Sequence, residues 1–67
     1  MKLKELDGIL FSMNLYDIKI NDEYVEGFEE GFESIMFKKY GKLEVISIVS
    51  GTDLILKKSI LSINLKK

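Results

Sequence analysis

Cysteine and histidine are absent from this chain of 67 residues, and so are proline, arginine and tryptophan. Without cysteine there is no disulfide framework, and without cysteine and histidine no zinc site of the usual kind can form. Small domains commonly rely on one of these two devices, so stability has to come from the hydrophobic core or from a partner chain. Apolar residues make up 46% of the sequence, a large share for a chain with little interior. We therefore expect self-association into a homo-oligomer.

Long apolar runs are also missing. No stretch approaches the roughly 18 residues that a membrane helix needs, and charged residues break the N-terminal region Met1–Glu5 before a signal-peptide core develops. Because proline, repeats and low-complexity segments are absent, there is no candidate linker. The sequence thus predicts a cytoplasmic protein with a single small domain over residues 1–67.

Residues that commonly carry catalysis are scarce. Nucleophilic and acid–base chemistry usually needs histidine, cysteine or carboxylates in contrasting environments, and the serines have no base partner at a diagnostic spacing. Glycine-rich phosphate-binding motifs are missing, and the carboxylate spacing matches no calcium loop. We expect a protein without enzymatic activity, cofactor or bound metal.

Hydrophobic periodicity predicts strands at the start of the chain. Residues 15–20 alternate between apolar and polar, as in a half-buried strand that turns Tyr16 and Ile18 inward. Residues 9–11 favour an earlier strand, although apolar residues between positions 3 and 13 also recur at helical spacing.

Residues 21–40 predict an amphipathic helix. Asn21 can cap the start, two lysines lie in the last turn, and Gly41 follows as a left-handed stop. Gly27 and Gly31 each cost about 1 kcal/mol in a helix interior, but they flank the apolar face, where another element could approach. The apolar face consists of Tyr24, Val25, Phe28, Phe32, Ile35 and Met36.

Two further strands are predicted after this helix. Residues 43–49 are largely apolar and β-branched, residues 50–53 have turn chemistry, and residues 54–65 return as a strand with a bulge or bend near Lys57. The fold class is therefore α+β: an antiparallel sheet of about four strands, with one helix packed on a face and the order ββαββ.

Charge is strongly segregated along the chain. Residues 1–21 hold three lysines and three acidic residues, residues 22–33 hold six acidic residues and no base, and residues 34–67 hold seven lysines and two acidic residues. On the predicted helix no lysine lies at i+4 to neutralise the acidic face, so this face could dock on a basic surface. The predicted partner-binding residues are Asp22, Glu23, Glu26, Glu29, Glu30 and Glu33.

We interpret the chain as a small non-catalytic interaction protein whose acidic helix face binds a basic surface of a protein partner. A phage-encoded inhibitor or regulator is one class that fits, because the lysine-only basic residues suggest an AT-rich coding source. An ordinary solvated helix face is the simpler alternative.

Two segments resemble the signatures of the Sm-like family. The first is Ile18-Lys19-Ile20-Asn21-Asp22 with Gly27, Gly31-Phe32-Glu33 and Met36, and the second is Leu56-Lys57-Lys58-Ser59-Ile60. The resemblance covers under half of the chain and implies an alternative: an all-β small barrel that assembles into a ring and binds RNA or nucleotides, with Lys57 and Lys58 near the pore. Without it, these lysines would serve to protect an edge strand from aggregation.

Overall fold

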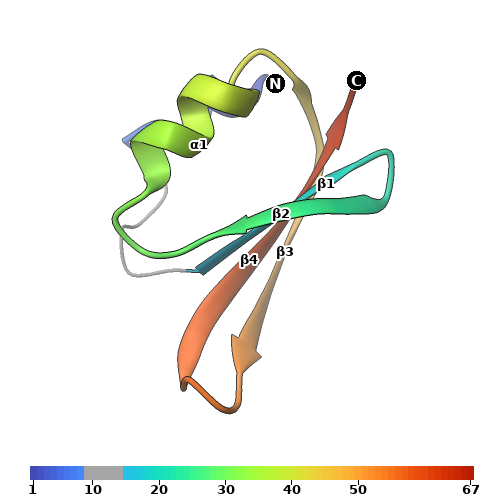
Figure 1. The fold of residues 1–67 in the computed structure, drawn as a ribbon. Helices are drawn as coiled ribbons and strands as arrows, with labels where there is room; N and C mark the ends of the chain where they lie inside the picture. Colours follow the sequence, from blue (N-terminus) through green and yellow to red (C-terminus); the bar gives the residue numbers. More distant parts are fainter. Residues whose placement is uncertain (9–14) are drawn as a thin grey trace.

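The computed structural model describes residues 1–8 and 15–67, which form one sheet with one α-helix against it (Figure 1). A short 3-10 helix, η1 (Leu3–Leu6), precedes the sheet. The remaining elements are β1 (Leu15–Ile20), β2 (Glu23–Phe28), α1 (Glu33–Tyr40), β3 (Glu44–Asp53) and β4 (Lys58–Lys66). The predicted order ββαββ is confirmed, with β1 and β2 as its first pair. The strand expected over residues 9–11 lies outside the described residues.

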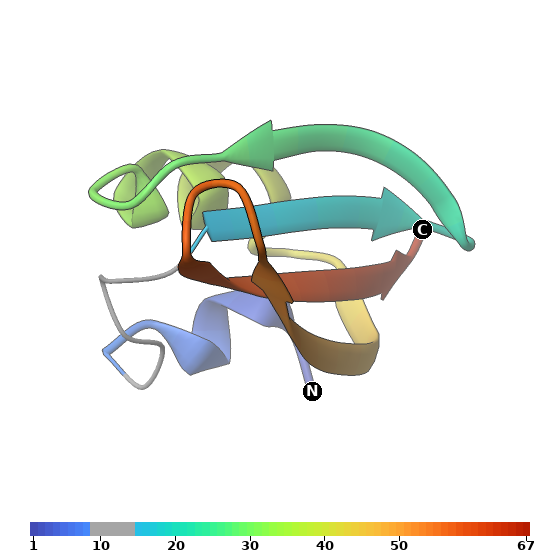
Figure 2. The same ribbon diagram turned by 90° about the horizontal axis from the view of Figure 1, so that it is seen from below.

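The sheet is mixed and has the strand order β2-β1-β4-β3. The two outer pairs, β1 with β2 and β3 with β4, are antiparallel, whereas the central strands β1 and β4 are parallel. Figure 2 shows these two central strands running side by side in one direction. The prediction of an antiparallel sheet is therefore wrong for the central pair. Alternation in a sequence tells which side chains face inward, but it does not tell which strand lies next to which.

The first half of the predicted helix over residues 21–40 is a strand. Asn21 and Asp22 have φ values of 51° and 70°, the left-handed pair that a two-residue hairpin turn needs. This turn sends β2 back along β1, with Asp17 opposite Gly27 and a shift in register between Ile18 and Lys19. A Cβ on Gly27 would lie 3.3 Å from the Tyr16 carbonyl oxygen. The absence of a side chain at Gly27 therefore permits a close approach between β2 and β1, and not between a helix and its neighbour.

Helix α1 occupies only the second half of the predicted range. Gly31, with a φ of 89°, turns the chain just before the helix, and Phe32 stands at the N-cap without a side-chain cap. The expectation of basic residues in the last turn is confirmed. Gly41, however, has a φ of −59° and is not a left-handed stop. A Cβ there would run into the carbonyl oxygen of Phe37, so the position requires glycine for lack of space.

The β3–β4 hairpin turns at residues 54–57, later than the predicted turn at 50–53. The Asp53 side chain sets this position, because its Oδ1 atom accepts hydrogen bonds from the backbone N–H groups of Ile55 and Leu56, both at 2.9 Å. Lys57 closes the turn with a φ of 54°. The apolar composition of residues 54–56 predicted a returning strand, yet Ile55 at the hairpin tip is 91% exposed.

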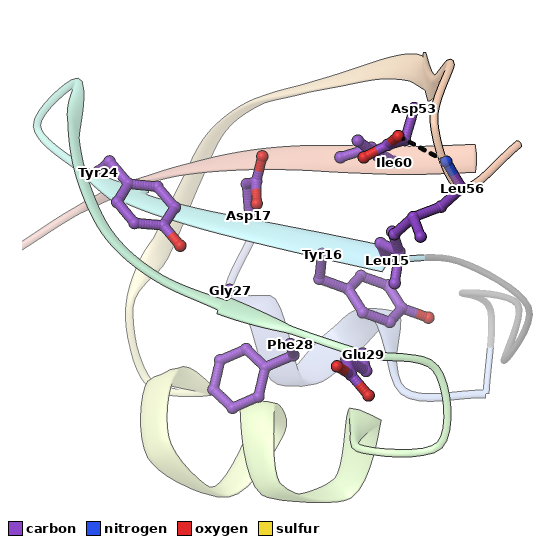
Figure 3. A pocket seen from close by; sticks show the side chains of 10 residues that line it. All are labelled: Leu15, Tyr16, Asp17, Tyr24, Gly27, Phe28, Glu29, Asp53, Leu56 and Ile60. Carbon is purple, nitrogen blue, oxygen red and sulfur yellow. Dashed lines mark hydrogen bonds between the residues drawn. The ribbon is translucent and has the colours of Figure 1, made fainter. Parts of the chain in front are cut away.

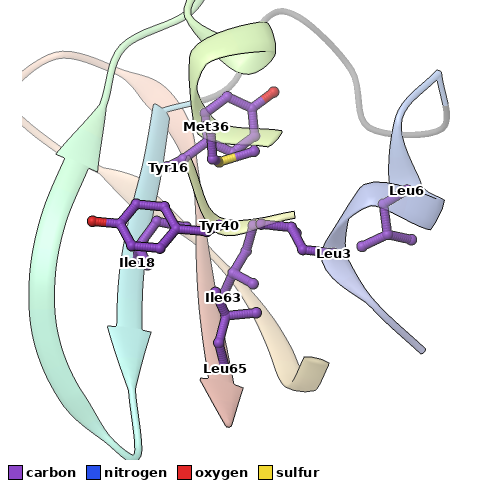
Figure 4. Close-up of a cluster of buried hydrophobic side chains, with 8 residues drawn as sticks. All are labelled: Leu3, Leu6, Tyr16, Ile18, Met36, Tyr40, Ile63 and Leu65. Carbon is purple, nitrogen blue, oxygen red and sulfur yellow. The ribbon is translucent and has the colours of Figure 1, made fainter. Parts of the chain in front are cut away.

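The hydrophobic core lies between the helices and one face of the sheet (Figure 4). Both central strands contribute the inward residues that their alternation predicts, η1 adds two leucines, and α1 adds a methionine and a tyrosine. The buried residues are Leu3, Leu6, Tyr16, Ile18, Met36, Tyr40, Ile63 and Leu65. Phe28 packs edge-on against Tyr40, with ring centroids 6.2 Å apart.

The apolar face predicted for residues 21–40 is largely exposed. Met36 is its one fully buried member, whereas Tyr24, Val25, Phe32 and Ile35 are exposed. For Tyr24 and Val25 this follows from the strand geometry of β2, because a period of 2 turns successive side chains to opposite faces of the sheet.

The described residues form an open sheet with a helix, which is the predicted α+β class and not the alternative all-β barrel. Within this part of the chain, none of the helices has the length and apolar character required to cross a membrane.

Candidate binding site

The six acidic residues predicted to bind a partner do not share a helix face. They are distributed over the β1–β2 turn, strand β2, the loop after it and the start of α1 (Asp22; Glu23 and Glu26; Glu29 and Glu30; Glu33). The single-face prediction is wrong because half of the segment is extended. Glu23 and Glu26 lie on β2, an edge strand of the sheet, whereas Asp22 lines a hollow with residues of β3 and β4.

Glu26 connects β2 to the end of α1. Its Oε2 atom accepts hydrogen bonds from Lys39 Nζ at 2.6 Å and from the Tyr40 hydroxyl at 2.8 Å. These two donors, the lysine first, hold the pKa of Glu26 below its usual range, and the carboxylate in turn raises the pKa of Lys39. Burial, and then the bond to Glu26, raise the pKa of Tyr40. The charge of Glu26 is thus balanced within the chain.

Lys58, one of the two lysines predicted for RNA binding, is also paired. Its Nζ atom lies 2.8 Å from Glu30 Oε1, and this hydrogen bond raises the pKa of Lys58. Lys57 lies exposed in the β3–β4 turn. The two lysines therefore differ, and only Lys57 presents a charge that no acidic residue of the described chain contacts.

Two more of the acidic residues make polar contacts with distant segments. The Asp22 N–H donates to Asn64 Oδ1 at 3.0 Å, and Asn64 Nδ2 donates to Asp22 Oδ1 at 2.7 Å. The Tyr16 hydroxyl donates to Glu33 Oε1 at 3.2 Å. Sequence reasoning looked for neutralising partners at helical spacing, but here the partners come from other elements.

A hollow of about 420 Å³ lies between β2 and the tip of the β3–β4 hairpin (Figure 3). Figure 3 shows side chains from β1, β2 and the hairpin pointing into it, with the turn of the hairpin at one side. We call this site the acidic hollow. Its lining residues are Leu15, Tyr16, Asp17, Tyr24, Gly27, Phe28, Glu29, Asp53, Leu56 and Ile60.

Three carboxylates and no basic side chain line the acidic hollow. They are Asp17 from β1, Glu29 after β2, and Asp53 at the end of β3. In the described ranges, no three such side chains come close enough to hold a metal ion. The three carboxylates thus border the opening from different elements without forming a metal-binding cluster.

The remaining walls are apolar. Leu15, Leu56 and Ile60 lie on one side in Figure 3, and Tyr24, which is 62% exposed, lies on the other. Sequence reasoning placed Tyr24 on the apolar face of a helix and Leu56 in the returning strand, so it missed both. The parallel pairing of β1 with β4, which sets Leu15 opposite Ile60, was the missing information.

A second hollow of about 320 Å³ adjoins the first and is lined by Gly27, Phe28, Glu29 and Phe32. Three of these residues belong to both hollows. Glu29 is therefore the one predicted partner-binding residue that borders both openings.

A contrasting hollow of about 520 Å³ lies at the other end of α1. Four of its lining residues are lysines, and Lys39 is paired with Glu26. Its lining residues are Ile20, Lys38, Lys39, Tyr40, Lys42, Leu43 and Lys67. We call it the lysine hollow.

Comparison of the chain with models of protein families, with curated proteins and with solved structures found no match.

Proposed function

We propose that this protein is a small non-catalytic interaction protein that binds a basic segment of a protein partner in the acidic hollow. The observation that carries the proposal is the lining of this site, where three carboxylates occur without any basic side chain. The class of partner is the one that the sequence predicts. The binding residues differ, because the site is formed by the contact of β1, β2 and the β3–β4 hairpin, and Glu29 alone comes from the predicted set.

The combination of charge and apolar surface suits a lysine or arginine side chain. Such side chains lay their aliphatic stems along apolar surface and keep the charged head among polar groups. In the acidic hollow, Leu15, Leu56 and Ile60 would contact the stem, while Asp17 and Glu29 would attract the head. The exposed ring of Tyr24 adds a face for a cation–π contact.

The attraction is local, because the whole chain has a net charge of only −1. Long-range steering by net charge would be weak, so recognition depends on groups in and around the site. Contacts between exposed charges are screened within about 8 Å at physiological ionic strength. Binding should therefore weaken as salt is raised.

An inhibitor that covers the basic, nucleic-acid-binding groove of another protein belongs to this class of function. In such a complex the carboxylates would occupy positions that phosphates otherwise take. A phage-encoded inhibitor is one example of a protein with this function.

The test is a titration of the isotope-labelled protein with a short peptide rich in lysine and arginine, followed by backbone amide NMR. We expect the largest shift changes at Asp17, Tyr24, Gly27 and Glu29. A peptide of the same length with glutamine in place of the basic residues should produce no such changes.

The matched variants are Asp17→Asn with Glu29→Gln, against Asp7→Asn as the control. Asp7 is an exposed carboxylate after η1, outside the acidic hollow. The double variant should lose at least tenfold in affinity, and the control should bind as the parent chain does. Equal binding by all three proteins, or shifts concentrated elsewhere, would contradict the proposal.

One observation favours the alternative, nucleic-acid binding. The lysine hollow gathers Lys38, Lys42 and Lys67, all exposed, around one opening, and phosphate contacts by lysine supply the non-specific part of nucleic-acid affinity. We propose this surface as the second candidate site; Lys57, in the turn at the opposite end of β4, is a separate basic position. The Sm-like resemblance supports the same class of ligand.

The alternative is tested by fluorescence anisotropy with labelled uridine-rich and adenine-rich RNA. If RNA is the ligand, Lys38→Gln with Lys42→Gln should weaken binding several-fold and lower its salt dependence, because fewer counterions are released. Asp17→Asn with Glu29→Gln should leave RNA affinity unchanged or raise it. The same two pairs of substitutions thus distinguish the two functions.

A further inference from the structure

Strand β3 forms one edge of the sheet, and the N-terminal segment covers only its beginning. The Val45 N–H donates to the Met1 carbonyl oxygen at 2.7 Å, and Lys2 forms an isolated bridge with Glu44. The Met1 ammonium group also lies 2.8 Å from the Glu44 carboxylate. Past Val45, no strand or bridge from residues 1–8 or 15–67 lies against the outer side of β3.

The uncovered stretch, residues 46–53, lacks most of the usual protection against pairing, although a shift in register with β4 at Ile46 marks its beginning. Natural edge strands are blunted by charges, proline or short length, whereas β3 spans ten residues without a charge between Glu44 and Asp53. Its apolar side chains are accessible: Ile46 is 52% and Val49 is 62% exposed. The opposite edge of the sheet differs, because β2 carries two glutamates along its length.

We propose that a second copy of this chain pairs with β3 in antiparallel orientation through residues 46–52. The two sheets would then join into one, with the two β3 strands at its centre. A two-fold axis perpendicular to such a sheet places one residue opposite its own symmetry mate, as in other isologous contacts. Residues 46–52 are centred on Val49, and this register leaves Val45 with Met1, so the axis passes between Val49 and the partner's Val49.

The free stretch is complementary to itself in this register. Ile48 lies opposite Ser50 and Ile46 opposite Thr52, so no charged side chain meets another in the central part. A pair of β-branched residues directly across the axis favours strand pairing. A longer overlap would displace the N-terminal segment from β3. A shorter overlap would leave backbone groups of the edge unpaired.

Charges at the ends of the stretch do not oppose the contact. Glu44 is paired with the terminal ammonium group, and Asp53 lies across the hairpin from Lys58. With a net charge of −1 for each copy, overall repulsion is small. A second copy of the chain supplies the partner strand, so no different protein is needed. Pairing with it would remove the apolar edge of β3 from water.

Sedimentation velocity over a range of concentrations tests the proposal. The parent chain should sediment as a dimer, and Val49→Lys should sediment as a monomer, because two ammonium groups would face each other across the axis. Ile35→Lys is the matched control, since Ile35 is an exposed β-branched residue on α1, and this variant should remain dimeric. Far-ultraviolet circular dichroism checks that the variants are folded.

Disulfide trapping supplies a second readout that does not depend on disrupting the contact. The chain has no cysteine, so Val49→Cys introduces a single thiol, and residues directly opposite in an antiparallel pair lie within the Cα range of a disulfide. Mild oxidation should convert this variant to a covalent dimer, whereas Ser34→Cys, exposed on α1, should stay uncrosslinked. A monomeric parent chain would overturn the proposal. So would a Val49→Lys variant that remains dimeric, or equal crosslinking of both cysteine variants.

Discussion

The Glu26 carboxylate lies 2.6 Å from the Lys39 ammonium group, although 13 positions separate the two residues in the sequence. The contact joins strand β2 to the last turn of α1, and the Tyr40 hydroxyl shares the same carboxylate oxygen. An acidic residue that the sequence suggests as a free binding group thus connects two elements of the fold.

This contact predicts how stability depends on pH. Because the pKa of Glu26 is lowered in the folded chain, its stabilising effect is present above the unfolded value of about 4.3 and is lost as pH falls through the folded value. Glu26→Gln should therefore lower the midpoint of urea unfolding at pH 7, and the difference from the parent chain should shrink toward pH 3. Glu23→Gln, at an exposed position on the same strand, serves as the control and should change the midpoint less at pH 7. If the difference in unfolding midpoint between Glu26→Gln and the parent chain stays constant from pH 7 to pH 3, the contact does not contribute through its charge.

Glu44 should show a dependence of the same sign. The N-terminal ammonium group lowers the pKa of Glu44 by a hydrogen bond, so part of the acid sensitivity should persist in Glu26→Gln. Adding Glu44→Gln to that variant should flatten the stability profile further below about pH 4.3.

The core makes a second prediction. Met36 is fully buried against the central strands, and truncating such a side chain removes apolar contacts and leaves a cavity. Met36→Ala should lower the free energy of unfolding by about 2–5 kcal/mol. Ile35→Ala, at the half-exposed neighbouring position, should cost clearly less. Similar costs for the two variants, measured by chemical denaturation, would mean that α1 does not pack through Met36.

Two glycines give a third prediction, because their backbone conformations differ. Gly31 has a φ of 89°, whereas Gly51 lies within β3 without a positive φ and with open space around its Cα. Gly31→Ala should destabilise the fold by about 1 kcal/mol, and Gly51→Ala should be neutral or stabilise it by about 0.5 kcal/mol. Both are compared at one fixed protein concentration, since the proposed dimer would make apparent stability depend on concentration. A larger loss for Gly51→Ala than for Gly31→Ala would contradict the described turn.

The sequence predicts the strands near the ends of the chain well, for a simple reason. Residues 15–20 and 60–65 alternate, and the residues that they turn inward, such as Ile18 and Ile63, are buried. A half-buried strand that packs on one face shows its period directly.

Residues 21–32 could not be assigned in the same way. Their apolar residues satisfy a helical period, while the strand signal depends on Asn21 and Asp22 adopting positive φ values as a pair. That dipeptide serves equally as a helix start and as a hairpin turn. Pairing with β1 decides between the two, and this is a tertiary effect.

The acidic hollow lies beyond what periodicity predicts. Asp17 and Asp53 are ordinary polar positions in the sequence. Asp17 comes near Glu29 because β1 pairs with β2, and Asp53 joins them because β4, the hairpin partner of β3, lies beside β1. The segregation of charge along the chain suggests a basic partner, which stays a prediction, but the residues that line the hollow depend on strand order.

The most direct test of the central claim is the affinity of the parent chain for the basic peptide, measured by calorimetry at low and at physiological salt. The same measurement is made on the double variant Asp17→Asn with Glu29→Gln. We predict saturable binding by the parent chain that weakens with salt and falls at least tenfold in the double variant, while Asp7→Asn binds normally. Binding that is absent, or that all three proteins show equally, would contradict a function based on the acidic hollow.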